Sequence, residues 1–163
     1  MVVYLEAEQA GPNPPKLPPS PEIRQRNATF TPGFMAVVKG QTVEMPNDDD
    51  VRHNVYSTSA DNAFDLGIYD AGDSRSVTLE HPGEVDIHCS VHESMNGTIF
   101  VSPSPWYATV AADGRFAIEA LPPGRYRLRT WSERLPVAQL FLRVLPGATV
   151  PVTVTIGLPA QAE

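Results

Sequence analysis

The sequence predicts an all-β protein, and two observations lead to that class. Seventeen prolines and eleven glycines divide the 163 residues into short extended pieces, and many of them fall in Pro-Gly or Pro-Pro pairs that mark turns. Between these turns, short apolar runs and alternating patterns recur, and no long stretch has helical spacing. With 42% hydrophobic residues, the chain has enough apolar side chains for one domain or two small ones.

The N-terminal residues read as a strand followed by a connector. The chain opens with Met1-Val-Val-Tyr-Leu-Glu6, without the basic start and apolar stretch of an export signal. We therefore expect that an export signal was removed ahead of residue 1. Residues 9–21 are rich in proline, which predicts a semi-rigid, extended spacer.

Four residues further along are candidate metal ligands. Cys89, His92 and Met95 have the spacing Cys-x-x-His-x-x-Met, and His53 lies well upstream. One thiolate, two imidazoles and a thioether are the ligand set of a blue-copper centre. Taken alone, each of these residues is more often an ordinary core or surface residue than a metal ligand. The ordered set of four is a far more specific sign of a metal site. We expect all four to bind one copper ion.

The strand before the ligand loop and the glycine after it are expected to shape the site. Alternation places Val85, Ile87 and Cys89 on one face and His88 on the other, so His88 is not expected to be a ligand. His81, before a Pro-Gly pair, is interpreted as a loop residue. Gly97 is predicted to let the chain turn before the next strand.

The segment Ile23 to Val101 resembles a small cupredoxin. The similar stretches are Val38-Lys-Gly-Gln-Thr-Val43, His53-Asn-Val55 and Pro82-Gly-Glu-Val-Asp-Ile-His-Cys89. The short ligand loop is most similar to that of amicyanin, and other motifs resemble plastocyanin-like or methylamine-utilisation-like proteins. The chain departs from the family at Val91, where Pro is common, and at His88, where an aromatic residue is frequent. The resemblance implies a Greek-key β-sandwich over residues 22–103 that binds copper through His53, Cys89, His92 and Met95.

The same resemblance implies roles for the neighbours of the ligands. Asn54 is expected to join the two ligand-bearing loops through the backbone of Ser90. The family also implies a one-electron carrier rather than an enzyme, located in the periplasm or outside the cell. Its redox partner proteins would dock transiently near His92. Phe34, Met35 and Val91 are candidates for the rim of that surface, although core packing explains the first two equally well.

Residues 104–158 are predicted to form a second β module. Asp113-Gly114 is a signal for a β-hairpin. From Arg125 to Thr130, arginines alternate with Tyr126, a leucine and a threonine, which predicts a strand with one basic and one apolar face. Further strands are expected over residues 139–145 and 149–156. The pattern resembles the transthyretin-like or carboxypeptidase-regulatory β-sandwich, a support module. The first strand of that family carries a run like Val2 to Leu5, so residues 2–6 are expected to pair with this module. Residues 1–8 then belong to it, and the cupredoxin is an insertion.

The net charge and the length of the apolar stretches limit the kinds of partner that the chain can be expected to bind. A formal charge of −7 and a pI near 5.0 argue against nucleic acid, whose phosphates require basic patches. The run Asp48-Asp49-Asp50 either steers a basic partner or is a solvated turn. No membrane span is expected, because the apolar stretch at 137–145 is far shorter than the roughly 20 residues needed. The single cysteine gives no information on the redox compartment.

Two other function classes stay open at this point. The first is a copper-handling protein, a chaperone or store, for which we expect exchangeable copper and no reversible redox wave. The second is a binding module in which the cupredoxin fold is only structural, for which we expect substoichiometric copper.

Overall fold

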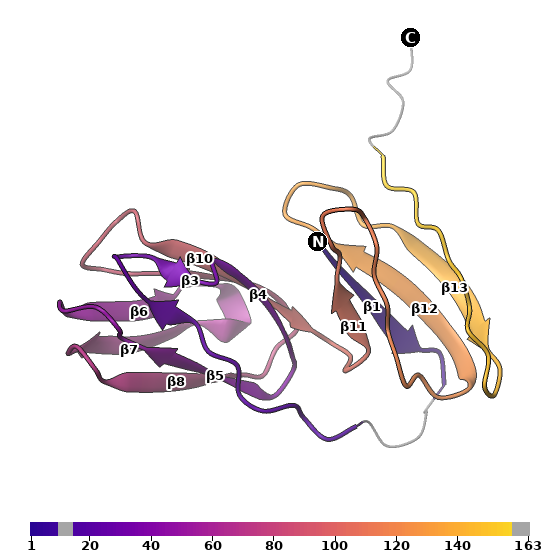
Figure 1. Ribbon diagram of the computed structural model, residues 1–163, viewed down its shortest axis with the longest axis horizontal. Helices are drawn as coiled ribbons and strands as arrows, with labels where there is room; N and C mark the ends of the chain where they lie inside the picture. The colour runs from indigo at the N-terminus through magenta and orange to yellow at the C-terminus, as the bar shows by residue number, and fades with distance from the viewer. Residues whose placement is uncertain (10–14, 158–163) are drawn as a thin grey trace, which may run out of the picture. The chain divides into compact units, whose positions relative to one another are not determined.

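The computed structural model describes residues 1–9 and 15–157, and their regular structure is almost entirely β (Figure 1). In chain order the strands are β1 (Val2–Ala7), β2 (Arg24–Gln25), β3 (Phe30–Thr31), β4 (Phe34–Val38), β5 (Gln41–Pro46), β6 (His53–Ser57), β7 (Phe64–Tyr69), β8 (Ser74–Leu79), β9 (Gly83–His88), β10 (Asn96–Ser102), β11 (Tyr107–Thr109), β12 (Gly124–Trp131) and β13 (Gln139–Val144). A short 3-10 turn, η1 (Ala60–Asn62), precedes β7. The predicted all-β class is confirmed. Part of the predicted spacer, residues 10–14, lies outside the described residues.

The chain divides into two compact units. One, here called the central unit, is Lys16–Pro103, and the other, here called the terminal unit, combines Met1–Pro15 with Ser104–Glu163. Across the residues that the structure describes, no helix is both long and apolar enough to cross a membrane.

The central unit is a β-sandwich. Its larger sheet has the order β4-β10-β9-β6-β7, in which β4 runs parallel to β10 and the other neighbours are antiparallel. A second ladder joins β5 to β8, and a small one joins β2 to β3. Buried residues from both sides, such as Met45 and Leu79 from β5 and β8 and Ile87 and Ile99 from the larger sheet, form one core. The sheets therefore pack face to face around a common apolar layer.

Strand β9 leads Cys89 and the loop after it into the core. Val85 and Ile87 are fully buried and Cys89 is 3% exposed, whereas His88 is only half-buried. This is the alternation that the sequence predicted, because successive side chains of a strand point to opposite faces. Cys89, the first residue after β9, therefore enters the interior at one end of the sandwich.

Gly97 lies inside β10, opposite Ile87 of β9, so the prediction that it turns the chain is wrong. A Cβ atom at this position would lie 3.0 Å from the carbonyl oxygen of Gly33 and 3.3 Å from Cγ1 of Ile87. The same Gly33 oxygen accepts the N–H of Thr98 at 2.9 Å. A side chain at this position would press on the neighbouring backbone, which favours glycine here.

The terminal unit is built on one antiparallel sheet of order β11-β1-β12-β13. Strand β1 lies between β11 and β12, so the N-terminal strand shares a sheet with residues beyond 104. In β12, Tyr126, Leu128 and Thr130 are buried, and the arginines between them occupy the other face. There the Arg127 guanidinium donates to the Glu6 carboxylate at 2.9 Å. The predicted alternation of β12 is confirmed.

Two extended segments cover the apolar face of this sheet without joining a ladder. Residues 149–156 were predicted to be a strand, and the Asp113-Gly114 signal predicted a hairpin. Neither residues 149–156 nor residues 115–118, which follow the turn, form a strand. The turn itself forms, since the N–H of Gly114 donates to the Ala111 carbonyl at 2.9 Å. Both segments bury alternate apolar side chains against the sheet, around a cavity of about 910 Å³. The strand predictions are wrong because alternation specifies a buried face but not a hydrogen-bonding partner.

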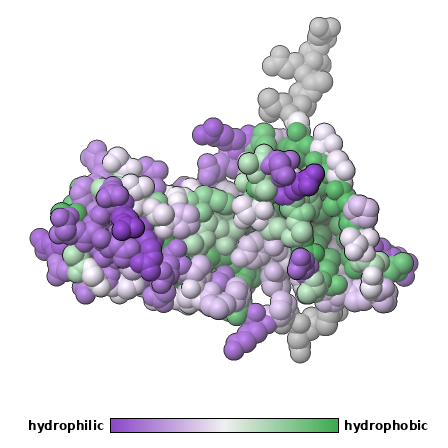
Figure 2. Space-filling view, viewed as in Figure 1, coloured by the Kyte–Doolittle hydropathy of each residue, from purple (hydrophilic) through white to green (hydrophobic). Residues whose placement is uncertain are grey.

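The two units also differ at the surface. On the face drawn in Figure 2, the end of the central unit on the left is mainly hydrophilic, whereas the terminal unit shows several hydrophobic patches. Phe141 of β13 is the most exposed large apolar side chain of the described residues, with 65% of its surface accessible.

Candidate metal centre

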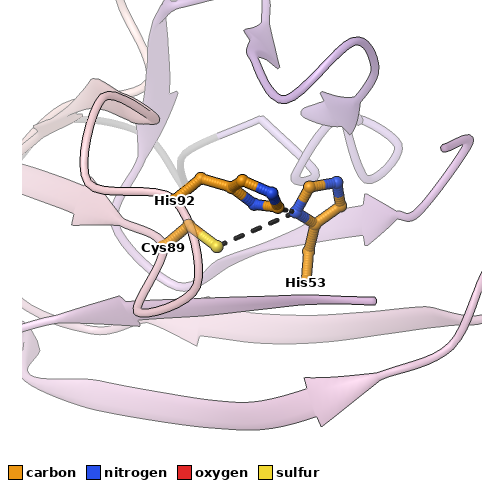
Figure 3. Close-up of side chains that lie close together, drawn as sticks. All are labelled: His53, Cys89 and His92. Carbon is orange, nitrogen blue, oxygen red and sulfur yellow. Dashed lines mark hydrogen bonds between the residues drawn. The ribbon is translucent and has the colours of Figure 1, made fainter. Parts of the chain in front are cut away.

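Three side chains from two parts of the central unit converge on one point (Figure 3). His53 is the first residue of β6, Cys89 follows β9, and His92 lies in the loop that leads to β10. Strands β6 and β9 are neighbours in the larger sheet, so residues that are 36 positions apart in the chain meet at the same end of the sandwich.

The ligand atoms of this group lie close together. They all fall within 4.8 Å of one another. Cys89 Sγ is 3.8 Å from His53 Nδ1, and the Nδ1 atoms of His53 and His92 are 3.1 Å apart. His53 is fully buried, Cys89 is 3% exposed and His92 is half-buried.

This donor set fits a soft metal ion. One cysteine sulfur and two imidazole nitrogens offer three electron pairs to a single point. Two imidazole lone pairs 3.1 Å apart repel unless a cation or a proton lies between them. Mixed sulfur and imidazole ligation of this kind suits copper. Among the residues that the structure describes, this is the only group of three or more His, Cys or acidic residues with such spacing.

The loop between Cys89 and Met95 is closed by two backbone hydrogen bonds. Cys89 N–H donates to the Met95 carbonyl at 3.1 Å, and Met95 N–H donates to the His92 carbonyl at 3.0 Å. Met95 is 1% exposed and belongs to the same buried core as Cys89. The loop therefore turns its sulfur-bearing residues inward, and the role of Met95 as the fourth ligand stays a prediction.

The buried imidazole is oriented by a carboxylate. His53 Nε2 lies 2.7 Å from Asp49 Oδ2, and the Asp49 side chain is only 11% exposed. When Nε2–H donates to Asp49, the lone pair is on Nδ1, the nitrogen that faces Cys89 and His92. Asp49 is thus not the solvated turn residue that an acidic run suggests. No sequence signal separates it from Asp48 and Asp50, because its contact depends on the path of the loop.

The carboxyl group of Asp49 is held in its ionised form. Burial alone raises its pKa, but hydrogen bonds from the Ala28 N–H, the His53 ring and the Asn27 N–H outweigh that effect, and the net pKa is lowered. An ionised carboxylate has no hydrogen to donate, so it accepts all three N–H groups.

Asn54 connects the two segments that carry His53 and Cys89. The Ser90 N–H donates to Asn54 Oδ1 at 3.3 Å, and Asn54 Nδ2 donates to Asp65 Oδ1 at 2.6 Å. Asn54 is 3% exposed. Its effect on the properties of a bound metal stays a prediction.

The other predicted residues lie outside the group. The His88 ring packs against Tyr56 with 5.7 Å between ring centroids, and His81 is exposed. Met35 of β4 packs against the central core, which accounts for it without a docking role. Val91 is 48% exposed beside His92.

Comparison with solved structures returned several copper proteins. The chain is similar to a purple cupredoxin from Nitrosopumilus maritimus, with 26% identity and a TM-score of 0.45 over 51% of this chain and 99% of that one. It is also similar to a copper-containing nitrite reductase from Thermus scotoductus SA-01, with 23% identity and a TM-score of 0.49 over 60% of this chain but 25% of that one. An amicyanin variant in its reduced state gives 19% identity and a TM-score of 0.48, over 61% of this chain and 99% of that one. No curated protein sequence matches the chain.

A family model identifies the protein family to which the chain belongs. The model that describes copper-binding proteins of the plastocyanin/azurin family matches residues 20–102, about half of the 163 residues. The matched range contains the whole His–Cys–His group, and copper is the cofactor that this group accommodates. The chain therefore belongs to the plastocyanin/azurin family of copper-binding proteins, the cupredoxins.

Proposed function

We propose that this chain is a type 1 (blue) copper protein that acts as a soluble one-electron carrier between redox partner proteins. The observation that supports this most strongly is the convergence of one thiol and two imidazoles in a buried site. His53, Cys89 and His92 would hold the ion, and the buried thioether of Met95 would be the fourth ligand. Bound copper supplies one-electron chemistry, since it is stable in two oxidation states.

The chain contributes a rigid ligand frame. His53 is fixed by its position in β6 and by Asp49, and Cys89 is fixed by the end of β9 and by the bond from its N–H to Met95. Ligands held in this way have little freedom to rearrange when the charge of the site changes. Burial of His53 and Cys89 keeps water away from the site. A low demand for rearrangement is what an electron carrier requires.

One side of the frame is more accessible to solvent than the rest. His92 is half-buried, and Val91 beside it is 48% exposed. We propose that a redox partner docks transiently over these residues. The exposed Asp50 lies in the loop that precedes His53, and its charge would attract a basic partner over a distance. The charge of its neighbour Asp48 is paired with Arg24 at 2.8 Å.

The same features favour an electron carrier over the alternatives. A copper chaperone needs a site from which the ion leaves easily, whereas two of the three converging ligands here are at most 3% exposed. A copper enzyme of the nitrite reductase kind would need a second ligand cluster, and the described residues hold one such group. We therefore propose that the chain has no catalytic activity of its own.

We propose that the terminal unit is a support module for the copper-binding unit. We propose that residues 1–8 and 104–158 form a transthyretin-like module into which the cupredoxin, residues 22–103, is inserted. The pairing of β1 with β11 and β12 supports this arrangement. By analogy with the family, we propose that the protein works in the periplasm or outside the cell.

Voltammetry combined with a copper-exchange assay tests the proposed function. The copper-loaded chain is expected to give a reversible one-electron wave at a stable potential and to retain its ion against a moderate excess of chelator. Loss of the ion to the chelator without a reversible wave would indicate a copper-handling protein. Substoichiometric copper after loading would favour a binding module and would contradict the proposal.

A further inference from the structure

The hydrogen-bond network behind His53 extends well beyond the ligand itself. Asp49 Oδ2 lies 2.7 Å from His53 Nε2 and also accepts the Ala28 N–H at 2.9 Å. Asp49 Oδ1 accepts the Asn27 N–H at 2.5 Å. One carboxylate thus receives three N–H groups, two from a turn and one from the ligand.

That turn is built in an unusual conformation. Asn27 and Ala28 have φ angles of 53° and 50°, a region that residues other than glycine rarely adopt. They connect β2 to β3, and the ends of the turn are closed by reciprocal backbone bonds between Arg26 and Thr29 of 2.9 and 3.1 Å. Successive N–H groups in such a turn point to the same side and form a binding site for an anion, which here is Asp49.

The loop that carries Asp49 is fixed from its other side as well. Asp49 N–H donates to Asn47 Oδ1 at 3.1 Å, and Asn47 Nδ2 donates to the Val51 carbonyl at 2.9 Å. Asn47 is 1% exposed. The carboxylate therefore has a defined position before any metal binds, with the β2–β3 turn on one side and the Asn47 side chain on the other.

We propose that Asp49 is a positioning residue for the metal centre, which acts through His53 to favour the oxidised ion over the reduced one. This inference rests on the proposed copper site. The carboxylate fixes the ring so that Nδ1 carries the lone pair, and its negative charge increases the electron density at Nδ1. A more electron-rich imidazole stabilises the ion of higher charge more than the ion of lower charge.

Asp49→Asn is the direct test, because it removes the charge and keeps the size of the side chain. The amide has one oxygen and one NH₂ group, so it cannot accept all three N–H groups. Loss of an outer contact of this kind typically weakens metal affinity about 10–100-fold. We expect the dissociation constant for copper(II) to rise at least about tenfold while that for copper(I) changes little. The midpoint potential should then rise by about 59 mV or more, since a tenfold change corresponds to about 59 mV for one electron.

Asp50→Asn is the matched control. It removes the same charge from the same loop, but Asp50 is exposed, so solvent screens its effect. We expect a clearly smaller change of potential than in Asp49→Asn. Equal shifts in the two variants, or a copper(II) dissociation constant for Asp49→Asn within about twofold of the unaltered chain, would overturn the positioning role. An unaltered chain that binds no copper would instead overturn the proposed function, and this inference with it.

A measurement on the unaltered chain covers the case in which Asp49→Asn does not fold. In the copper(I) form, which is diamagnetic, nitrogen-resolved NMR should find the His53 proton on Nε2, protected from exchange with water. A His53 ring that carries no proton on Nε2, or one that exchanges as fast as an exposed histidine, would contradict the contact with Asp49 and overturn the inference.

Discussion

The two units of this chain complete their cores in different ways. In the central unit, two ladders enclose fourteen buried residues, among them Cys89 and Met95. In the terminal unit, one sheet contributes five buried residues, and the layer that covers it, with Phe116, Val150 and Val152, is only half-buried and forms no ladder. The difference shows that alternating apolar residues are enough to cover a face, but that a closed core needs paired strands on both sides.

The units differ equally in charge. The central unit holds thirteen of the 19 acidic residues and six of the 12 basic ones, which gives it the whole net charge of −7. The terminal unit holds six of each and is formally neutral. If a basic partner is attracted over a distance, as proposed, that attraction acts on the unit that carries the metal site.

The largest expected difference between the units is their response to copper. Only the central unit contains the His–Cys–His group. At a free copper concentration 1,000-fold above the dissociation constant, binding stabilises the folded state by about 4 kcal/mol. Calorimetry with and without copper should therefore show one unfolding transition that moves and one that stays. A shift of both transitions together would show that the units unfold as one.

The sheet of the terminal unit and the layer that covers it can be compared by shortening one side chain in each. Leu128 is 1% exposed in β12, whereas Val152 is half-buried in the covering layer beside the cavity. Leu128→Ala should cost about 2–5 kcal/mol, and Val152→Ala about 1 kcal/mol or less. Both losses are expected in the transition that copper does not move. Similar losses in the two variants would mean that the covering layer is as well packed as the sheet.

A third prediction concerns the close backbone contact in the central unit. Gly97→Ala places a Cβ 3.0 Å from the Gly33 carbonyl oxygen, and such overpacking costs about 1–3 kcal/mol. Gly33→Ala is the control, because its Cβ would meet its nearest neighbour, the Phe30 carbonyl oxygen, at 3.8 Å. We expect the first variant to lower the copper-sensitive transition by several degrees and the second to leave it nearly unchanged. An unchanged transition in Gly97→Ala would refute the steric explanation.

The smallest expected effect is at the turn that holds Asp49. Ala28 has a φ of 50°, which costs roughly 1–2 kcal/mol for a residue with a Cβ. Ala28→Gly relieves this cost and adds some flexibility to the unfolded chain, so the net gain should be about 0.5–1 kcal/mol. The N–H that donates to Asp49 is kept, and the midpoint potential should not change. Chemical denaturation measures the first effect and voltammetry the second.

The sequence was informative where the chemistry of a residue type is specific. The order His, then Cys-x-x-His-x-x-Met, indicated a metal group, and the structure brings His53, Cys89 and His92 together. The alternation around Ile87 correctly predicted which side of β9 faces the core. The Cys-x-x-His-x-x-Met spacing and the alternation of β9 are local, so a sequence shows them directly.

Features that depend on a distant partner were not predictable in the same way. Asp49 looks like its neighbours in the sequence. His53 is only four residues further on, but the distant β2–β3 turn is what holds this aspartate, and not Asp48 or Asp50, against the ring. Gly97 looks like a turn residue, and only the path of the chain past Gly33 shows why it has no side chain. The segment at residues 149–156 has the pattern of a strand but no paired neighbour.

The central claim is that the Cys89 thiolate, together with His53 and His92, binds one copper ion. The most direct test is the visible spectrum of the copper(II)-loaded chain beside that of Cys89→Ser, with copper content measured in both. The unaltered chain should bind one copper per chain and show an intense visible band, which the serine variant should lack because the sulfur-to-copper charge transfer is gone. An intense band retained in Cys89→Ser, or no such band in the fully loaded unaltered chain, would contradict the account.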